Sequence, residues 1–346
     1  MHTDRRDFLR AASTIAVAGT AFTAADGAAT AAPTTPVPAA PARTAKRAMA
    51  RGLTLLTLRR NNELRLGVKT PRGVLDVKEA AGLLRLPAPT TLDDLLQNED
   101  GANLNALVDA ALKSPTTAKS ILNETAIDYG PLVNRPEKII CVGLNYRKHA
   151  EEIGAPAPKQ PVLFNKFNNT LQAHNSKVKL PTDHASKFDY ETELVILMGK
   201  EARNVPEADA LNYVAGYATG NDFSARDLQL ETGGQWMIGK TPDHFAPIGP
   251  YMITAEQVDP DNLKIETRVN GEVRQSSNTS DMIFNTRQII SYISRFITIR
   301  PGDIIFTGTP EGVIQGKPAA KRVWLKPGDK IACSLEKLGE LAFDLV

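Results

Sequence analysis

From residue 138 to residue 346 the sequence is a series of short apolar runs separated by Gly, Pro and Asp. The clearest runs cover residues 139–142, 194–198, 265–269, 304–307 and 330–335. Runs of this length and spacing are typical of β-strands joined by turns, and they argue against a doubly wound α/β fold. Apolar residues at helical spacing predict one helix over residues 286–296. We therefore expect a β-rich α+β domain over residues 132–346.

Residues 52–131 predict a small α+β domain of their own. Apolar residues that alternate or cluster over residues 53–58, 64–68 and 73–77 predict strands. Amphipathic stretches at residues 91–97 and 102–113 predict two helices.

The N-terminus predicts export. Asp4-Arg5-Arg6-Asp7-Phe8-Leu9-Arg10 precedes an uncharged, Ala-rich stretch over residues 11–25, a pattern typical of a twin-arginine (Tat) signal peptide. The alternative is a short N-terminal helix. We assign residues 1–31 to the signal and residues 32–51 to a disordered Ala/Pro linker. We expect a periplasmic or secreted protein with no membrane association after export, since no later segment is long and apolar enough to cross a bilayer.

Charge and cysteine content exclude two classes of function. The 41 basic residues nearly balance the 39 acidic ones, so nucleic acid is not an expected partner. Two cysteines, Cys141 and Cys333, are too few for a metal-thiolate site. Both lie in apolar runs, which favours buried free thiols, although a disulfide in an oxidising compartment is the alternative.

Three acidic residues suggest a metal site. Glu191 and Glu193 stand two apart at the start of an apolar run, so alternation along a strand places both carboxylates on one face. Two like charges held that close need a cation or a proton, and hard oxygen ligands suit Mg²⁺, Mn²⁺ or Ca²⁺. The alternative is an exposed strand edge that carries both glutamates. Asp222 follows another apolar stretch and is either a third ligand or a helix cap.

Several sequence blocks in this order resemble the fumarylacetoacetate hydrolase family. They cover residues 140–152, 189–200, 221–229, 238–240, 269–272 and 301–313. The resemblance implies the fold of that family, a mixed β-sandwich roll with a small N-terminal α+β domain. It also implies a divalent metal, Mg²⁺ or Mn²⁺, bound by Glu191, Glu193 and Asp222, and commonly a homodimer.

The resemblance assigns further roles within the site. His149 and Glu152, three apart on a helical turn, would activate water, while an ordinary surface salt link is the alternative. Lys240 would stabilise an oxyanion or enolate, although most lysines are simply exposed. The resemblance assigns substrate contacts to Lys166, Arg226, Gln229 and Thr309.

The expected substrate is a small 2-oxo acid. The leading interpretation is metal-dependent hydrolysis of a carbon–carbon bond in an acylpyruvate-like 2-oxo acid, such as a fumarylpyruvate or fumarylacetoacetate type of substrate. Decarboxylases, isomerases and hydratases of 2-oxo acids share this scaffold and remain alternatives. A further alternative is an exported protein that binds metal and carboxylates without catalysis. Phe167-Asn168-Asn169 after Lys166 departs from the family pattern and predicts a reshaped pocket wall there.

Overall fold

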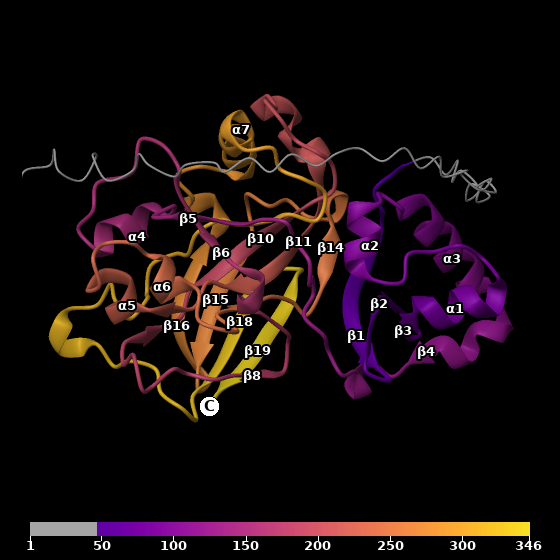
Figure 1. The fold of residues 1–346 in the computed structure, drawn as a ribbon, viewed down its shortest axis with the longest axis horizontal. Helices are drawn as coiled ribbons and strands as arrows, with labels where there is room; N and C mark the ends of the chain where they lie inside the picture. Colours follow the sequence, from indigo (N-terminus) through magenta and orange to yellow (C-terminus); the bar gives the residue numbers. More distant parts are fainter. Residues whose placement is uncertain (1–46) are drawn as a thin grey trace, which may run out of the picture. The chain divides into compact units, whose positions relative to one another are not determined.

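The computed structural model describes residues 47–346, which belong to one compact unit (Figure 1). Its largest element is a ten-stranded mixed sheet. In spatial order its strands are β4 (Ile121–Leu122), β3 (Gly73–Asp76), β2 (Glu63–Thr70), β1 (Thr54–Arg60), β14 (Met252–Thr254), β11 (Val214–Asn221), β10 (Thr192–Met198), β17 (Ile304–Phe306), β5 (Ile139–Gly143) and β6 (Val162–Lys166).

A five-stranded sheet and two short strand pairs complete the β-structure. The five-stranded sheet has the order β16 (Glu272–Asn278), β15 (Lys264–Val269), β18 (Lys330–Leu335), β19 (Gly339–Leu345) and β8 (Ser176–Val178). The short pairs are β12 (Ser224–Ala225) with β9 (Phe188–Asp189), and β13 (Ala246–Pro247) with β7 (Leu171–Gln172).

Seven α-helices accompany these strands in the described part of the chain. They are α1 (Val77–Leu84), α2 (Leu92–Gln97), α3 (Gly101–Lys113), α4 (Arg147–Glu152), α5 (Arg226–Leu230), α6 (Met237–Lys240) and α7 (Thr286–Phe296). Helix α7 begins at a capping box in which Asn285 and Gln288 satisfy each other's backbone N–H groups. None of the helices in residues 47–346 is long and apolar enough to span a membrane.

Strand β10 is buried along its whole length. Its first residues, Thr192 and Glu193, are therefore held in the interior of the protein. Val195 and Leu197 belong to the hydrophobic cluster that also includes residues of β1 and β2. Leu194 and Ile196 belong to a second cluster, together with residues of α7 and the five-stranded sheet. Because successive side chains of a strand point to opposite faces, burial on both faces explains the unbroken apolar run over residues 194–198 of β10.

The two domains expected from the sequence are joined by one sheet. Strand β1 pairs with β14, with Leu55 opposite Met252, so the indigo part in Figure 1 adds strands to the sheet that carries β10. The fold also begins before residue 52, because Ala48 exchanges backbone hydrogen bonds with Glu99 and Gly101. The last residues assigned to the disordered linker are therefore ordered.

The predicted β-rich α+β class is confirmed. The five strands predicted in residues 132–346 and the helix α7 form, as do β1 to β3, α2 and α3 of the first part. Both cysteines are buried free thiols, and burial raises the pKa of each. The predicted export signal and the linker as far as residue 46 lie outside the described residues.

Candidate metal centre and active site

The pairing of β10 with β11 brings three carboxylates together. Glu193 lies in β10 opposite Gly220, Glu191 directly precedes β10, and Asp222 directly follows β11. The Asp222 N–H donates to the Glu191 carbonyl at 2.9 Å. All three side chains are buried, and one oxygen from each lies within 4.8 Å of the others. The structure therefore brings together the three residues that the sequence predicts as metal ligands. The alternative for Asp222, a helix cap, is wrong for α5, because the N-cap of that helix is Ala225.

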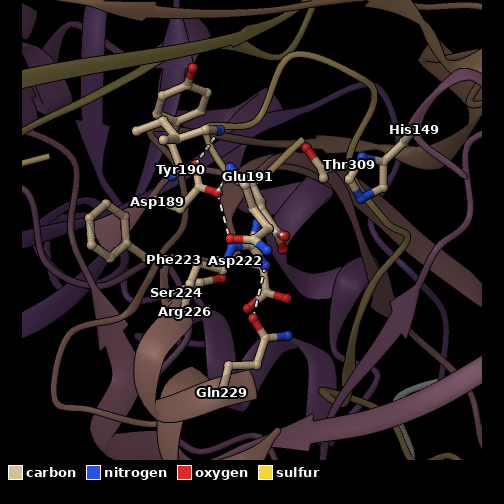
Figure 2. Close-up of polar contacts among 12 residues, drawn as sticks. His149, Asp189, Tyr190, Glu191, Asp222, Phe223, Ser224, Arg226, Gln229 and Thr309 are labelled. Carbon is tan, nitrogen blue, oxygen red and sulfur yellow. Dashed lines mark hydrogen bonds and ion pairs between the residues drawn. The ribbon is translucent and has the colours of Figure 1, made fainter. Parts of the chain in front are cut away.

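Three buried cations surround this acidic triad. Lys240 Nζ, from α6, lies 2.5 Å from Glu191 Oε2 and 2.8 Å from Asp222 Oδ2. Lys166 Nζ, at the end of β6, lies 2.5 Å from Asp222 Oδ1. Arg226 Nη2 donates to Glu191 Oε1 at 2.7 Å. Figure 2 shows Arg226 together with Asp189 and Gln229, to which it also donates. Lys240 is therefore a buried member of the site and not a surface lysine.

Two of the three acids, Glu191 and Asp222, form ion pairs with lysine or arginine side chains of the protein. Burial acts to raise the pKa of Glu191, but Lys240 and Arg226 outweigh it and lower that pKa to about 2. Burial, Asp222 and Glu191 together hold the pKa of Glu193 well above its usual range. Within residues 47–346, Glu193 forms no ion pair, and its side chain accepts a hydrogen bond from the Gly308 N–H at 2.7 Å. A buried carboxylate without a cationic partner fits a divalent cation bound by Glu191, Glu193 and Asp222.

His149 and Glu152 form a pair on one turn of α4, as their spacing predicted. His149 Nδ1 lies 2.7 Å from Glu152 Oε1, and Glu152 Oε2 accepts a hydrogen bond from the Gly312 N–H at 3.0 Å. His149 is buried and Glu152 half-buried. The pair is therefore tied to a loop of the same site and is not a solvent-exposed salt link.

The triad and the His149–Glu152 pair face one cavity of about 620 Å³. Polar lining residues are His149, Glu152, Glu191, Glu193, Asp222, Arg226, Gln229, Lys240, Thr309, Gln315, Lys317 and Arg322. Apolar lining residues include Val142, Leu144, Ile153, Phe164, Leu230 and Trp236. A cavity of this size and mixed lining is typical of a small-molecule site.

Of the four residues assigned to substrate binding, three line the cavity and one contacts a carboxylate of the triad instead. Arg226, Gln229 and Thr309 line the cavity, and Arg226 Nη1 donates to Gln229 Oε1 at 2.9 Å. Lys166 does not line it: this lysine is buried and contacts Asp222, so it supports a triad carboxylate instead. Phe167 is also absent from the wall and is 48% exposed, so the reshaping expected after Lys166 does not reach the cavity.

Asp189 is a site residue that the sequence interpretation missed. Its buried carboxylate accepts hydrogen bonds from Arg226 Nε at 2.9 Å and from the N–H groups of Ile314 and Gln315 at 2.8 and 3.0 Å. It thereby joins Arg226, which holds Glu191, to the loop that carries Gln315. The available signal was an acid between two aromatic residues, Phe188 and Tyr190, which is an unusual place for an exposed carboxylate.

Gln275 was missed for a different reason. It is buried on β16, and its Nε2 donates to Thr309 Oγ1 at 2.9 Å and to the Pro310 carbonyl at 2.8 Å. The Thr309 hydroxyl in turn donates to the Thr192 carbonyl at 3.0 Å. This network holds the turn from which Gly308 contacts Glu193, but nothing in the sequence near residue 275 indicates it.

Comparison with known proteins agrees with this geometry. The family model described as fumarylacetoacetate (FAA) hydrolase C-terminal matches residues 138–346. The chain belongs to the fumarylacetoacetate hydrolase family. The family and the fold predicted from the sequence are therefore confirmed.

Three relatives illustrate the range of activities in the family. The mitochondrial oxaloacetate tautomerase FAHD2A of Bos taurus is 41% identical over 270 residues, 77% of this chain and 82% of the relative. The fumarylacetoacetate hydrolase structure from Exiguobacterium antarcticum is 30% identical, with a TM-score of 0.71, and the match covers 85% of this chain and 99% of that one. A fumarylpyruvate hydrolase from Pseudomonas aeruginosa, in complex with Mn²⁺ and pyruvate, is 37% identical, with a TM-score of 0.55 and coverage of 61% and 90%.

Proposed function

We propose that this protein is a divalent-metal-dependent enzyme that interconverts the enol and keto forms of a 2-oxo acid, with oxaloacetate as its substrate. The observation that carries the proposal is one cavity in which His149, paired with Glu152, faces the acidic triad and Lys240. The 41% identity to an oxaloacetate tautomerase over 77% of this chain supports this reaction type and substrate. Mg²⁺ is our first choice of metal, followed by Mn²⁺ and Ca²⁺, because all three ligands are carboxylates.

The side chains suit proton transfer at the carbon next to a keto group. A divalent cation bound to the triad would draw electron density from the keto oxygen and so acidify that carbon. With Glu152 beside Nδ1, the His149 imidazole carries its proton on Nδ1, and Nε2 accepts or returns the substrate proton. Lys240, whose pKa is raised by Asp222 and Glu191 against the effect of burial, stays positively charged and stabilises the enolate oxygen.

Hydrolysis of an acylpyruvate-like substrate is the second candidate. The cavity of about 620 Å³ has room for more than a four-carbon acid, and the similar fumarylpyruvate hydrolase structure contains Mn²⁺ and pyruvate. In that reaction His149 would deprotonate water for attack on the distal carbonyl, and the pyruvate enolate would leave with the same stabilisation from Lys240.

A substrate panel with added Mg²⁺ or Mn²⁺ separates the candidates. A tautomerase converts enol-oxaloacetate to the keto form and leaves acetylpyruvate and fumarylpyruvate intact, whereas a hydrolase releases pyruvate from them. We expect Glu191→Ala and His149→Ala to lose turnover, while the exposed Glu201→Ala and His184→Ala, as matched controls, retain it. Metal binding without turnover of any of these acids would contradict the enzymatic proposal and favour the non-catalytic binder.

Export by the twin-arginine route is also part of the proposal, and it depends on residues 1–31 of the sequence alone. We expect these residues to carry a folded reporter out of the cytoplasm, and Arg5→Lys combined with Arg6→Lys to abolish that export. Continued export of the double variant would contradict the assignment. A homodimer is expected in solution, and sedimentation equilibrium of the mature chain measures it.

A further inference from the structure

Two cationic side chains in the cavity wall have no acidic partner. Lys317 and Arg322 are both half-buried and both line the cavity. No carboxylate in residues 47–346 forms an ion pair with either of them. The two other cations of the wall, Arg226 and Lys240, are both paired with Glu191. The cavity therefore contains a second pair of positive charges that no acid of the described chain neutralises.

The segment that carries these cations is anchored where it begins. The N–H groups of Ile314 and Gln315 donate to Asp189. Gly316 packs so tightly against Glu152 that a Cβ atom at this position would lie 2.4 Å from Glu152 Cδ. Lys317 is therefore the next residue after Gly316, whose backbone packs against Glu152.

Lys317 and Arg322 are also held to each other. Arg322 Nε donates a 2.8 Å hydrogen bond to the Lys317 carbonyl across the short 3₁₀ helix Ala319–Lys321. This bond uses Nε alone, and neither Nη1 nor Nη2 of Arg322 has a hydrogen-bond partner in the described chain. The guanidinium is thus oriented by the backbone while its outer N–H groups remain available, which suits a carboxylate ligand.

Within residues 47–346, neither cation forms a hydrogen bond or an ion pair with the acidic triad, so the triad does not use these two charges. We propose that Lys317 and Arg322 form a subsite for the second carboxylate of a dicarboxylic 2-oxo acid. The inference rests on the proposed function, because the 2-oxo end of the substrate must lie at the triad. It makes these two residues determinants of substrate class: the enzyme prefers a 2-oxo acid with a negatively charged far end over one with a neutral far end.

Paired substrates that differ only at the far end test this subsite. For a tautomerase, oxaloacetate is compared with its 4-ethyl ester; for a hydrolase, fumarylpyruvate is compared with acetylpyruvate. Each comparison uses the wild type, Lys317→Gln and Arg322→Gln. We expect each variant to raise the KM of the dicarboxylate by about tenfold or more, which is the usual effect of losing one charge-assisted hydrogen bond. The KM of the ester or of acetylpyruvate should change by less than about twofold, and kcat should change little.

Two further variants control for general charge effects and for folding. Lys321→Gln removes an exposed cation from the same segment and should leave both KM values unchanged. Lys317→Arg keeps the charge and should keep most of the preference, with an unfolding temperature like that of the wild type. The subsite is wrong if Lys317→Gln and Arg322→Gln affect the acid and the ester equally, or affect neither, in an active enzyme.

The subsite can also be tested if the protein does not catalyse the proposed reaction. If the wild type converts none of these acids, calorimetric binding of 2-oxoglutarate and of 2-oxobutanoate to the metal-loaded protein replaces the kinetics. Tighter binding of the dicarboxylate that is lost in Lys317→Gln and Arg322→Gln supports the subsite without catalysis. Equal binding of the two acids overturns it.

Discussion

The Gly308 N–H donates to Glu193 Oε2 at 2.7 Å, and no cation of residues 47–346 pairs with this buried carboxylate. Gly308 has a φ of +101°, and a Cβ atom there would lie 2.8 Å from Asn145 Cβ. The glycine therefore serves both the turn and the close approach of its N–H to Glu193. In this geometry Glu191 and Asp222 have protein cations, and Glu193 is the carboxylate whose charge a metal would balance.

Glu193→Gln tests this assignment. We expect loss of Mg²⁺ and Mn²⁺ binding, because a neutral amide replaces one of three carboxylate ligands. The metal-free variant should be at least as stable as the metal-free wild type, since the change removes a buried ionisable carboxyl group that has no cationic partner. Calorimetry for the metal and thermal unfolding in the presence of EDTA measure the two effects. Metal affinity equal to that of the wild type would show that Glu193 is not a ligand.

Asp189→Asn should destabilise the fold and weaken the site. The substitution removes the charge that pairs with buried Arg226 and disturbs the hydrogen bonds from Ile314 and Gln315. Arg226 keeps its ion pair with Glu191, so we expect the loss of charge-assisted hydrogen bonds to cost about 1.5–3 kcal/mol of unfolding free energy. Urea unfolding measures the loss, and exposed Asp183→Asn is the matched control. A loss below about 1 kcal/mol would contradict the central role given to Asp189.

His174 predicts a pH dependence of stability. Burial lowers its pKa from 6.5 to about 4, its Nδ1 accepts the Ala342 N–H at 3.1 Å, and the Tyr129 ring packs edge-on against it at 4.8 Å. Well above pH 6.5 the histidine is neutral in both the folded and the unfolded state and contributes nothing to the pH dependence. As the pH falls from 6.5 towards 4, the unfolded state takes up a proton that the folded state does not, so stability falls.

Urea unfolding at pH 7.5 and pH 5.0 measures this effect. We expect His174→Asn to lose less stability than the wild type between the two pH values, whereas exposed His184→Asn should lose as much as the wild type. An identical pH dependence of the wild type and His174→Asn would show that His174 does not titrate abnormally.

The residues that the sequence identified are those whose chemistry depends on local spacing. Alternation placed Glu191 and Glu193 on one face, and α4 places His149 three residues from Glu152 on a single turn. Strand β10 was predictable because its residues 194–198, buried on both faces, form an unbroken apolar run. The resemblance of several sequence blocks then brought distant parts of the chain, such as Lys240, to the same site.

The residues that were missed or misplaced depend on tertiary contacts. Lys166 was assigned to the cavity wall, but its position behind Asp222 follows from the packing of β6 near the end of β11. Gln275 reaches the site only because the five-stranded sheet packs against the turn at Thr309. Helix α1 was not predicted because its apolar residues continue directly from β3, where Asp76 ends the strand and caps the helix.

Turnover and metal affinity of His149→Ala, measured on the same sample, test the central claim most directly. The claim is that a metal bound by the acidic triad would hold the 2-oxo end of the substrate and that His149 moves the proton in the same cavity. We predict Mg²⁺ affinity within about threefold of the wild type and conversion of enol-oxaloacetate at least about a hundredfold slower, the usual effect of removing a general acid–base group. Conversion at the wild-type rate by metal-loaded His149→Ala would contradict the account.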